Sequence, residues 1–133
     1  MADDAPEASL EAAFDRAAAA ATEAAAAAAE AEAEEDDQRF FLAGLRMGLE
    51  QAGKDKRAAV DAEDFEAARR YKRREEQLEH RIAATEAELD RVARVRLTAA
   101  VEQEAAEARV KVMRAAVDDA RRAPATEAGR EAE

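Results

Sequence analysis

The sequence predicts an all-α protein: an αα-hairpin that continues into one long coiled-coil-like helix, with an acidic segment rich in Ala and Glu in front of it. Three observations lead to this prediction. Hydrophobic residues make up 48% of the 133 residues but aromatic residues only 4%, which is typical of long helices without a large globular core. Neither Gly nor Pro occurs between Phe65 and Arg122. Apolar residues recur along that stretch at heptad spacing.

The composition argues against catalysis and against binding of a cofactor or metal. The chain has no Cys, so no thiolate metal site is expected. Ser9 is the only serine and His80 the only histidine, so neither a site with several histidines nor a catalytic Ser–His–Asp triad is expected. No Gly-rich phosphate loop follows a strand. The start is acidic where a signal peptide is basic, and no apolar run is long enough to cross a bilayer. We therefore expect a non-enzymatic, cytoplasmic protein that does not enter membranes.

Residues 1–37 carry the whole net charge of the chain. They hold 12 acidic residues and 1 basic residue, a net charge of −11, whereas residues 38–133 hold 20 of each. Alanine accounts for 18 of them, and Leu10 and Phe14 are the only bulky apolar residues after Met1. Alanine favours helix, but a helix with so little to bury gains little from packing. We expect a low-complexity segment that is transiently helical and mostly solvated, with a continuous helix as the alternative.

Residues 38–84 are expected to form a helical hairpin. Apolar residues of its first helix follow helical spacing at Phe41, Leu45, Leu49 and Ala52. Small residues also share one face of this helix, at Gly44, Gly48 and Ala52, which indicates that another helix packs closely there. Gly53 either weakens the first helix or ends it, and the sequence leaves both outcomes open.

The chain is expected to reverse at residues 62–64. Asp61 or Asp64 can cap the second helix. Residues whose numbers sum to about 127 then face each other, and the pairs are mostly apolar. They include Leu49 with Leu78, Leu45 with Ile82, Ala59 with Ala68 and Leu42 with Thr85.

Residues 85–122 extend the second helix, and a heptad register runs through its whole length. One column is Tyr71, Leu78, Thr85, Val92, Ala99, Ala106, Met113 and Ala120. The other is Ala68, Glu75, Ile82, Leu89, Arg96, Gln103, Val110 and Val117. A second apolar stripe beyond Val95 consists of Val101, Ala105, Ala108 and Val112, so this part can touch two neighbours, and residues 85–120 are a possible homo-oligomer contact. Pro124 and the polar tail of residues 123–133 are expected to close the ordered part.

The stretch KRAAVDAEDFEAARRYKRREEQL, residues 56–78, resembles the UVR motif, a short helical hairpin whose turn carries an acid-aromatic-acid step. The matching positions are Ala59, Val60, Asp64, Phe65, Glu66, Ala68, Tyr71, Lys72 and Leu78. The spelling is especially similar to copies in eukaryotic ciliary and centrosomal proteins. The resemblance implies a docking hairpin without catalysis. Glu75 departs from the motif, which has an apolar residue there.

A basic run occupies five of the six positions from 69 to 74: Arg69, Arg70, Lys72, Arg73 and Arg74. Such a run can bind phosphates. Acidic residues at helical spacing surround it, however, and no set of aromatic residues offers a stacking platform for bases. A solvated or salt-bridged helical face is the favoured interpretation, protein docking is second, and nucleic-acid binding is third.

Three side chains of the motif have specific expected places. Phe65 should fold over the turn and cover its small neighbours. Tyr71 should lie on the inner column with its ring against the first helix. Glu75 should pair at the rim with Lys54 or Lys56.

These observations leave two classes of function. The first is an adaptor that docks protein partners through the UVR-like hairpin and the long helix. The alternative is a structural coiled-coil component of a cytoskeletal or ciliary assembly. A nucleic-acid-associated protein is less expected, because the chain is acidic.

Overall fold

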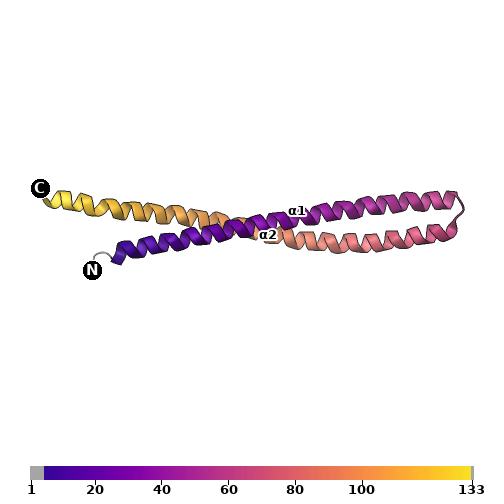
Figure 1. Cartoon of the computed structure of the whole chain (residues 1–133), viewed down its shortest axis with the longest axis horizontal. Helices are drawn as coiled ribbons and strands as arrows, with labels where there is room; N and C mark the ends of the chain where they lie inside the picture. Colours follow the sequence, from indigo (N-terminus) through magenta and orange to yellow (C-terminus); the bar gives the residue numbers. More distant parts are fainter. Residues whose placement is uncertain (1–4, 133) are drawn as a thin grey trace. The chain divides into compact units, whose positions relative to one another are not determined.

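The computed structural model describes residues 5–132, with side chains for residues 9–122. Two helices, α1 (Ala5–Asp61) and α2 (Phe65–Ala132), are joined by a turn at residues 62–64, and no strand occurs among the described residues. Figure 1 shows the chain reversing at this turn. The prediction of an all-α fold with a helical hairpin is confirmed.

The chain divides into two compact units, each made of a part of α1 and a part of α2. The turn unit comprises Ala31–Arg96 and contains the hairpin turn. The terminal unit comprises Met1–Glu30 and Leu97–Glu133.

The core of the turn unit is a small apolar cluster between the two helices. Leu45, Ala52 and Leu78 are buried in it, and Leu49 and Ile82 pack against them. These are residues that face each other when the chain reverses so that paired residue numbers sum to about 127. The register of the hairpin therefore follows from the apolar pattern, because a shift of either helix would expose a leucine.

Both predicted columns of α2 face the inside of their units. Each described member is buried or half-buried, and Val92 is the most completely covered at 1% exposed. The second apolar stripe of the distal helix has no such cover: its four residues are all exposed. Only one of the two stripes is therefore used within the chain.

Two of the polar positions that interrupt the second column have charged partners on α1. Glu75 Oε1 lies 2.6 Å from Lys56 Nζ, a close ion pair whose alignment is not that of a hydrogen bond, so Lys56 is the partner among the two expected. Arg96 Nε donates to Glu35 Oε2, and the Glu35 carboxylate is also 2.6 Å from Arg39 Nη2. Because Glu35 is 3% exposed, this pairing removes the cost of an isolated buried charge.

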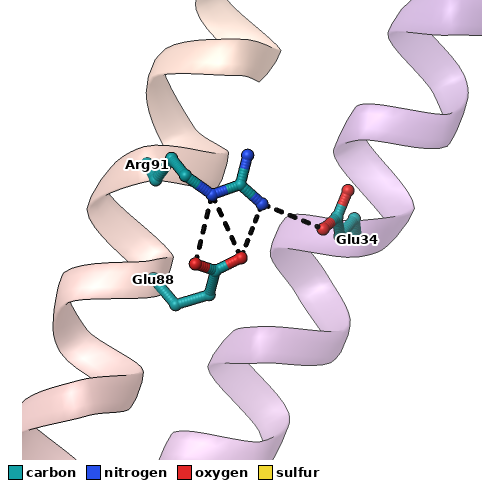
Figure 2. A network of polar contacts seen from close by, with 3 residues as sticks. All are labelled: Glu34, Glu88 and Arg91. Atoms are coloured by element: carbon teal, nitrogen blue, oxygen red, sulfur yellow. Dashed lines mark hydrogen bonds and ion pairs between the residues drawn. The ribbon is translucent and has the colours of Figure 1, made fainter.

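A third charged contact joins the helices at the surface of the turn unit. In Figure 2, Arg91 of α2 lies between Glu88 of the same helix and Glu34 of α1. Its Nη2 is 2.5 Å from Glu88 Oε1 and 3.7 Å from Glu34 Oε1. The hydrogen bond from Arg91 lowers the pKa of the Glu88 carboxyl, and the Arg91 pKa is raised in return. The contacts orient the arginine across the helix pair.

The alanine-rich segment is more ordered than its composition suggests. In the terminal unit it is helical from Ala5, Ala17 is 6% exposed, and Phe14 is half-buried. Arg114 stacks over the Phe14 ring at 5.8 Å, and Arg121 Nη2 is 2.9 Å from Glu11 Oε1. The structure therefore follows the alternative of a continuous helix. Most described side chains of residues 9–37 are nonetheless exposed, and only Ala17, Ala31 and Glu35 among them are buried.

Neither helix ends at the residue that could have broken it. Gly53 lies within α1, which continues to Asp61. Pro124 lies within α2, which continues to Ala132 although a proline removes one backbone hydrogen bond, so the expectation that order ends there differs from the structure. Gly53 is half-buried and faces Glu75 of α2, so packing of the two helices offsets its cost of about 1 kcal/mol.

Candidate docking site at the helical turn

The turn is closed by backbone hydrogen bonds that end α1. Glu63 N donates to Val60 O over 3.0 Å, and Asp64 N donates to Ala59 O over 2.9 Å. Glu63 has φ of 60°, the left-handed conformation that this type of helix end requires and that glycine usually supplies. The turn therefore holds a non-glycine residue in a conformation that costs roughly 1 kcal/mol or more.

Asp64 also begins α2. Its Oδ1 accepts a hydrogen bond from Ala67 N at 3.1 Å, which makes it the N-cap of the second helix. Of the two aspartates that could have capped α2, Asp64 is the one used. Glu66 lies in the first turn of α2, where a negative charge is favoured by the helix dipole. Because one residue both completes α1 and caps α2, the turn is short and has a defined geometry.

Phe65 does not cover the turn. Its side chain is 59% exposed, so the expectation that the ring folds over the small residues beside it was wrong. The physical reason is its place on the helix. Phe65 lies three residues before Ala68 and one residue after the Asp64 cap, at the edge of the inner columns and not within them, so its side chain points to the side of the hairpin.

The exposed ring lines an open depression on the side of the hairpin. Val60, which is 48% exposed, and Ala68 share its apolar lining with Phe65. The other residues that line it are basic: Lys56, Arg69 and Lys72. An apolar floor surrounded by positive charges can accept an apolar side chain that is carried on an acidic segment.

The other residues of the motif have structural roles. Tyr71 is half-buried on the inner column, as expected. Leu78 is 5% exposed in the core cluster and is not available to a partner. The motif thus divides into residues that hold the hairpin together and residues that the hairpin exposes.

No protein-family model, curated protein or solved structure matches this chain. The candidate site therefore rests on the geometry of the chain itself.

The basic run is a solvated face. Arg69, Arg70, Lys72, Arg73 and Arg74 are all exposed. Within the part of the chain that the structure describes, none of them forms an ion pair or a side-chain hydrogen bond, so the salt bridges allowed by the sequence do not form. Their charges are therefore not committed to neighbouring carboxylates.

The sequence interpretation did not single out a second exposed apolar surface on α1. Phe40 is 85% exposed and Met47 is 71% exposed, and the two lie on one face because they are seven residues apart. Gly44 lies between them with open space where a Cβ would stand, whereas Gly48 faces Leu78. The strip of small residues in the sequence therefore splits between the outer and inner faces, and the spacing of Phe40 and Met47 was the signal for the outer one.

No group of three or more His, Cys, Asp or Glu side chains among the described residues is placed to hold a metal ion. None of the described helical stretches is both long enough and apolar enough to pass through a bilayer.

Proposed function

We propose that this chain is a non-catalytic adaptor that docks another protein at the depression beside the helical turn. The observation that carries the proposal is the exposure of Phe65, at 59%, in a depression that it lines together with Val60 and three cationic side chains. Exposed aromatic residues in partly enclosed apolar surroundings are frequent anchors of protein interfaces. The partner segment that fits is acidic and carries an apolar residue.

The charges around the depression favour this class of partner. Arg69 and Lys72 have no ion pair among the described residues, and Lys56 shares its charge with Glu75 alone. Positive charges at a rim increase the rate at which an acidic segment associates, and the apolar contact then slows its release. The basic run next to the depression extends the same field along α2.

The resemblance of residues 56–78 to the UVR motif supports the same proposal, since that motif implies a docking hairpin without catalysis. Its similarity to ciliary and centrosomal copies favours a cytoplasmic partner in a cytoskeletal assembly. A structural role within such an assembly is the second candidate, and the observation that favours it is the exposed stripe of α2.

The test uses the full chain and two synthetic peptides of equal length. Both peptides have leucine and phenylalanine at the same positions. The remaining positions are glutamate in the acidic peptide and lysine in the basic one. We expect saturable binding of the acidic peptide, seen as NMR shifts of amides in residues 56–72. Phe65→Ala should weaken it about tenfold, or 1.4 kcal/mol. Phe40→Ala is the matched control, because that phenylalanine is 85% exposed on another surface, and it should bind like the parent.

Other outcomes would reject the proposal. Equal binding of the two peptides, or binding that Phe65→Ala leaves unchanged, would show that the depression is not the docking site. A DNA duplex is the third probe. If it bound more tightly than the acidic peptide at about 150 mM salt and lost affinity steeply as salt increased, the basic run would be a nucleic-acid surface.

A further inference from the structure

The terminal unit leaves one face of α2 uncovered. Val101 and Val112 are each 65% exposed, and Ala105 and Ala108 lie exposed between them. The spacing of four, three and four residues places all four side chains in one line along the helix. The opposite face of the same helix holds the covered columns, with Val117 at 7% exposed. This line of apolar side chains is therefore not used inside the unit.

We propose that this face binds the same face of a second copy of the chain, with the two α2 helices antiparallel. The sequence of the stripe reads nearly the same in both directions. When one copy is reversed, residues of the stripe whose numbers sum to 213 meet, and residues on the flanks, which pack beside the stripe, pair at sums of 211 and 215. Val101 then faces the second copy's Val112, and Ala105 faces the second copy's Ala108. The alanines at the centre let the two helix backbones approach closely.

The charged residues beside the stripe favour a second, antiparallel copy of the chain as the partner. Glu102 and Arg109 lie on one flank, and Glu104 and Lys111 lie on the other, since each pair is seven residues apart. All four are exposed, and none forms an ion pair within the described chain. In the antiparallel arrangement each flank meets the same flank of the second copy. Glu102 then faces Arg109 and Glu104 faces Lys111, and symmetry makes four complementary contacts.

A parallel pair would use these charges less well. In a parallel pair, the flank of one helix that holds Glu104 meets the other flank of the second helix. A residue there lies near the residue five positions further along in the second copy, so only Glu104 finds a basic partner, which is Arg109. Glu102 would face Leu97, and Lys111 would face Ala116. The parallel pair therefore has two complementary contacts by symmetry where the antiparallel pair has four. Helix dipoles also favour the antiparallel orientation.

The first test is the dependence of mass on concentration for the full chain. Sedimentation from about 10 µM to about 1 mM should show a monomer–dimer equilibrium, because a short stripe of small residues supports only weak association. Glu104→Lys places like charges against Lys111 and should weaken the dimer at least about tenfold. Adding Lys111→Glu exchanges the two charges and should restore the dimer. Glu79→Lys changes the charge equally at an exposed position outside the stripe and should leave the dimer unchanged.

Cysteine cross-linking tests the orientation, since the chain has no cysteine of its own. A mixture of Val101→Cys and Val112→Cys chains should form mixed disulfide dimers under mild oxidation, and neither variant should form them efficiently alone. Efficient cross-linking of Val101→Cys alone would show a parallel pair and overturn the proposal. A monomer over the whole concentration range would overturn it as well, and so would a Glu104→Lys/Lys111→Glu chain that stays monomeric. Circular dichroism of each variant verifies that the helices are intact.

Discussion

Glu35 of α1 accepts a hydrogen bond from Arg96 of α2, and the two residues are 61 positions apart in the chain. The carboxylate is buried at 3% exposed, while the arginine side chain keeps 35% of its surface in water. The other partner of Glu35, Arg39, lies on α1 itself, so Arg96 is the contact that ties the buried carboxylate to α2 and restricts how the two helices can slide. The pair therefore supports the register that the leucines of the turn unit also favour.

Arg96→Leu should destabilise the turn unit by about 1–3 kcal/mol, because the buried Glu35 is left with Arg39 alone. The double variant Glu35→Leu/Arg96→Leu should recover most of that loss, since an apolar pair needs no charge compensation. Arg94→Leu is the control at an exposed position and should change stability by less than about 0.5 kcal/mol. Urea melts followed by circular dichroism measure all three. If the double variant is as unstable as the single one, the pair does not act as a unit.

Asp64→Ala should cost about 1 kcal/mol, because α2 loses the side chain that accepts from Ala67 N. Asp61→Ala serves as the control. Asp61 ends α1, where a negative charge opposes the helix dipole, so its removal should be neutral or slightly stabilising. Equal losses in the two variants would mean that the cap contributes nothing specific. Denaturant melts of the full chain provide the comparison.

Glu63→Gly should stabilise the hairpin by roughly 1 kcal/mol, because glycine adopts the left-handed conformation without a steric cost. Glu63→Val should have the opposite effect, since a β-branched residue is especially unfavourable there. The order of melting temperatures, with glycine highest and valine lowest, is the measured result. A glycine variant that melts below the parent would show that Glu63 makes a favourable contact in the native turn.

The pKa of Glu88 should be found below its ordinary value, chiefly because Arg91 donates hydrogen bonds to its carboxylate. A lowered pKa in the folded state means that, at pH values between the lowered and the ordinary pKa, the folded chain binds fewer protons than the unfolded chain. The stabilisation is therefore complete above the ordinary pKa and is lost as pH falls through the lowered one. Carboxyl NMR titration measures the shift, and Arg91→Gln should return the pKa of Glu88 toward normal. An unchanged pKa in that variant would assign the shift to another cause.

Phe14→Ala should destabilise the terminal unit by about 1–2 kcal/mol, less than a fully buried phenylalanine, because the ring is half-buried beneath Arg114. Phe40→Ala removes a phenylalanine that is 85% exposed and should be nearly neutral. Hydrogen exchange of amides in residues 10–30 measures the effect locally. Equal exchange in the two variants would mean that the alanine-rich segment does not depend on this contact.

The sequence by itself determined the helical fold, the position of the turn and the face of α2 that turns inward, whereas on α1 Phe41 and Gly44 lie exposed although their spacing predicted an inner face. Leucine and valine at heptad spacing leave one way for two helices to bury them, and a turn with Asp64 at the start of the second helix closes the pair. The pairing of Glu75 with Lys56 could be anticipated for the same reason, since a known register places charges as well as apolar residues.

Only the tertiary structure decided which residues remain outside. Phe65 was expected to cover the turn, but its side chain is 59% exposed and lines an open depression beside the turn. The alanine-rich segment could be transiently or continuously helical by composition alone, and its helix contacts a part of α2 that is distant in sequence, as the ion pair of Glu11 with Arg121 shows. Local composition describes what a residue prefers. The exposure of a side chain depends on which residues, distant in sequence, pack against it, and this is determined only when the helices pack together.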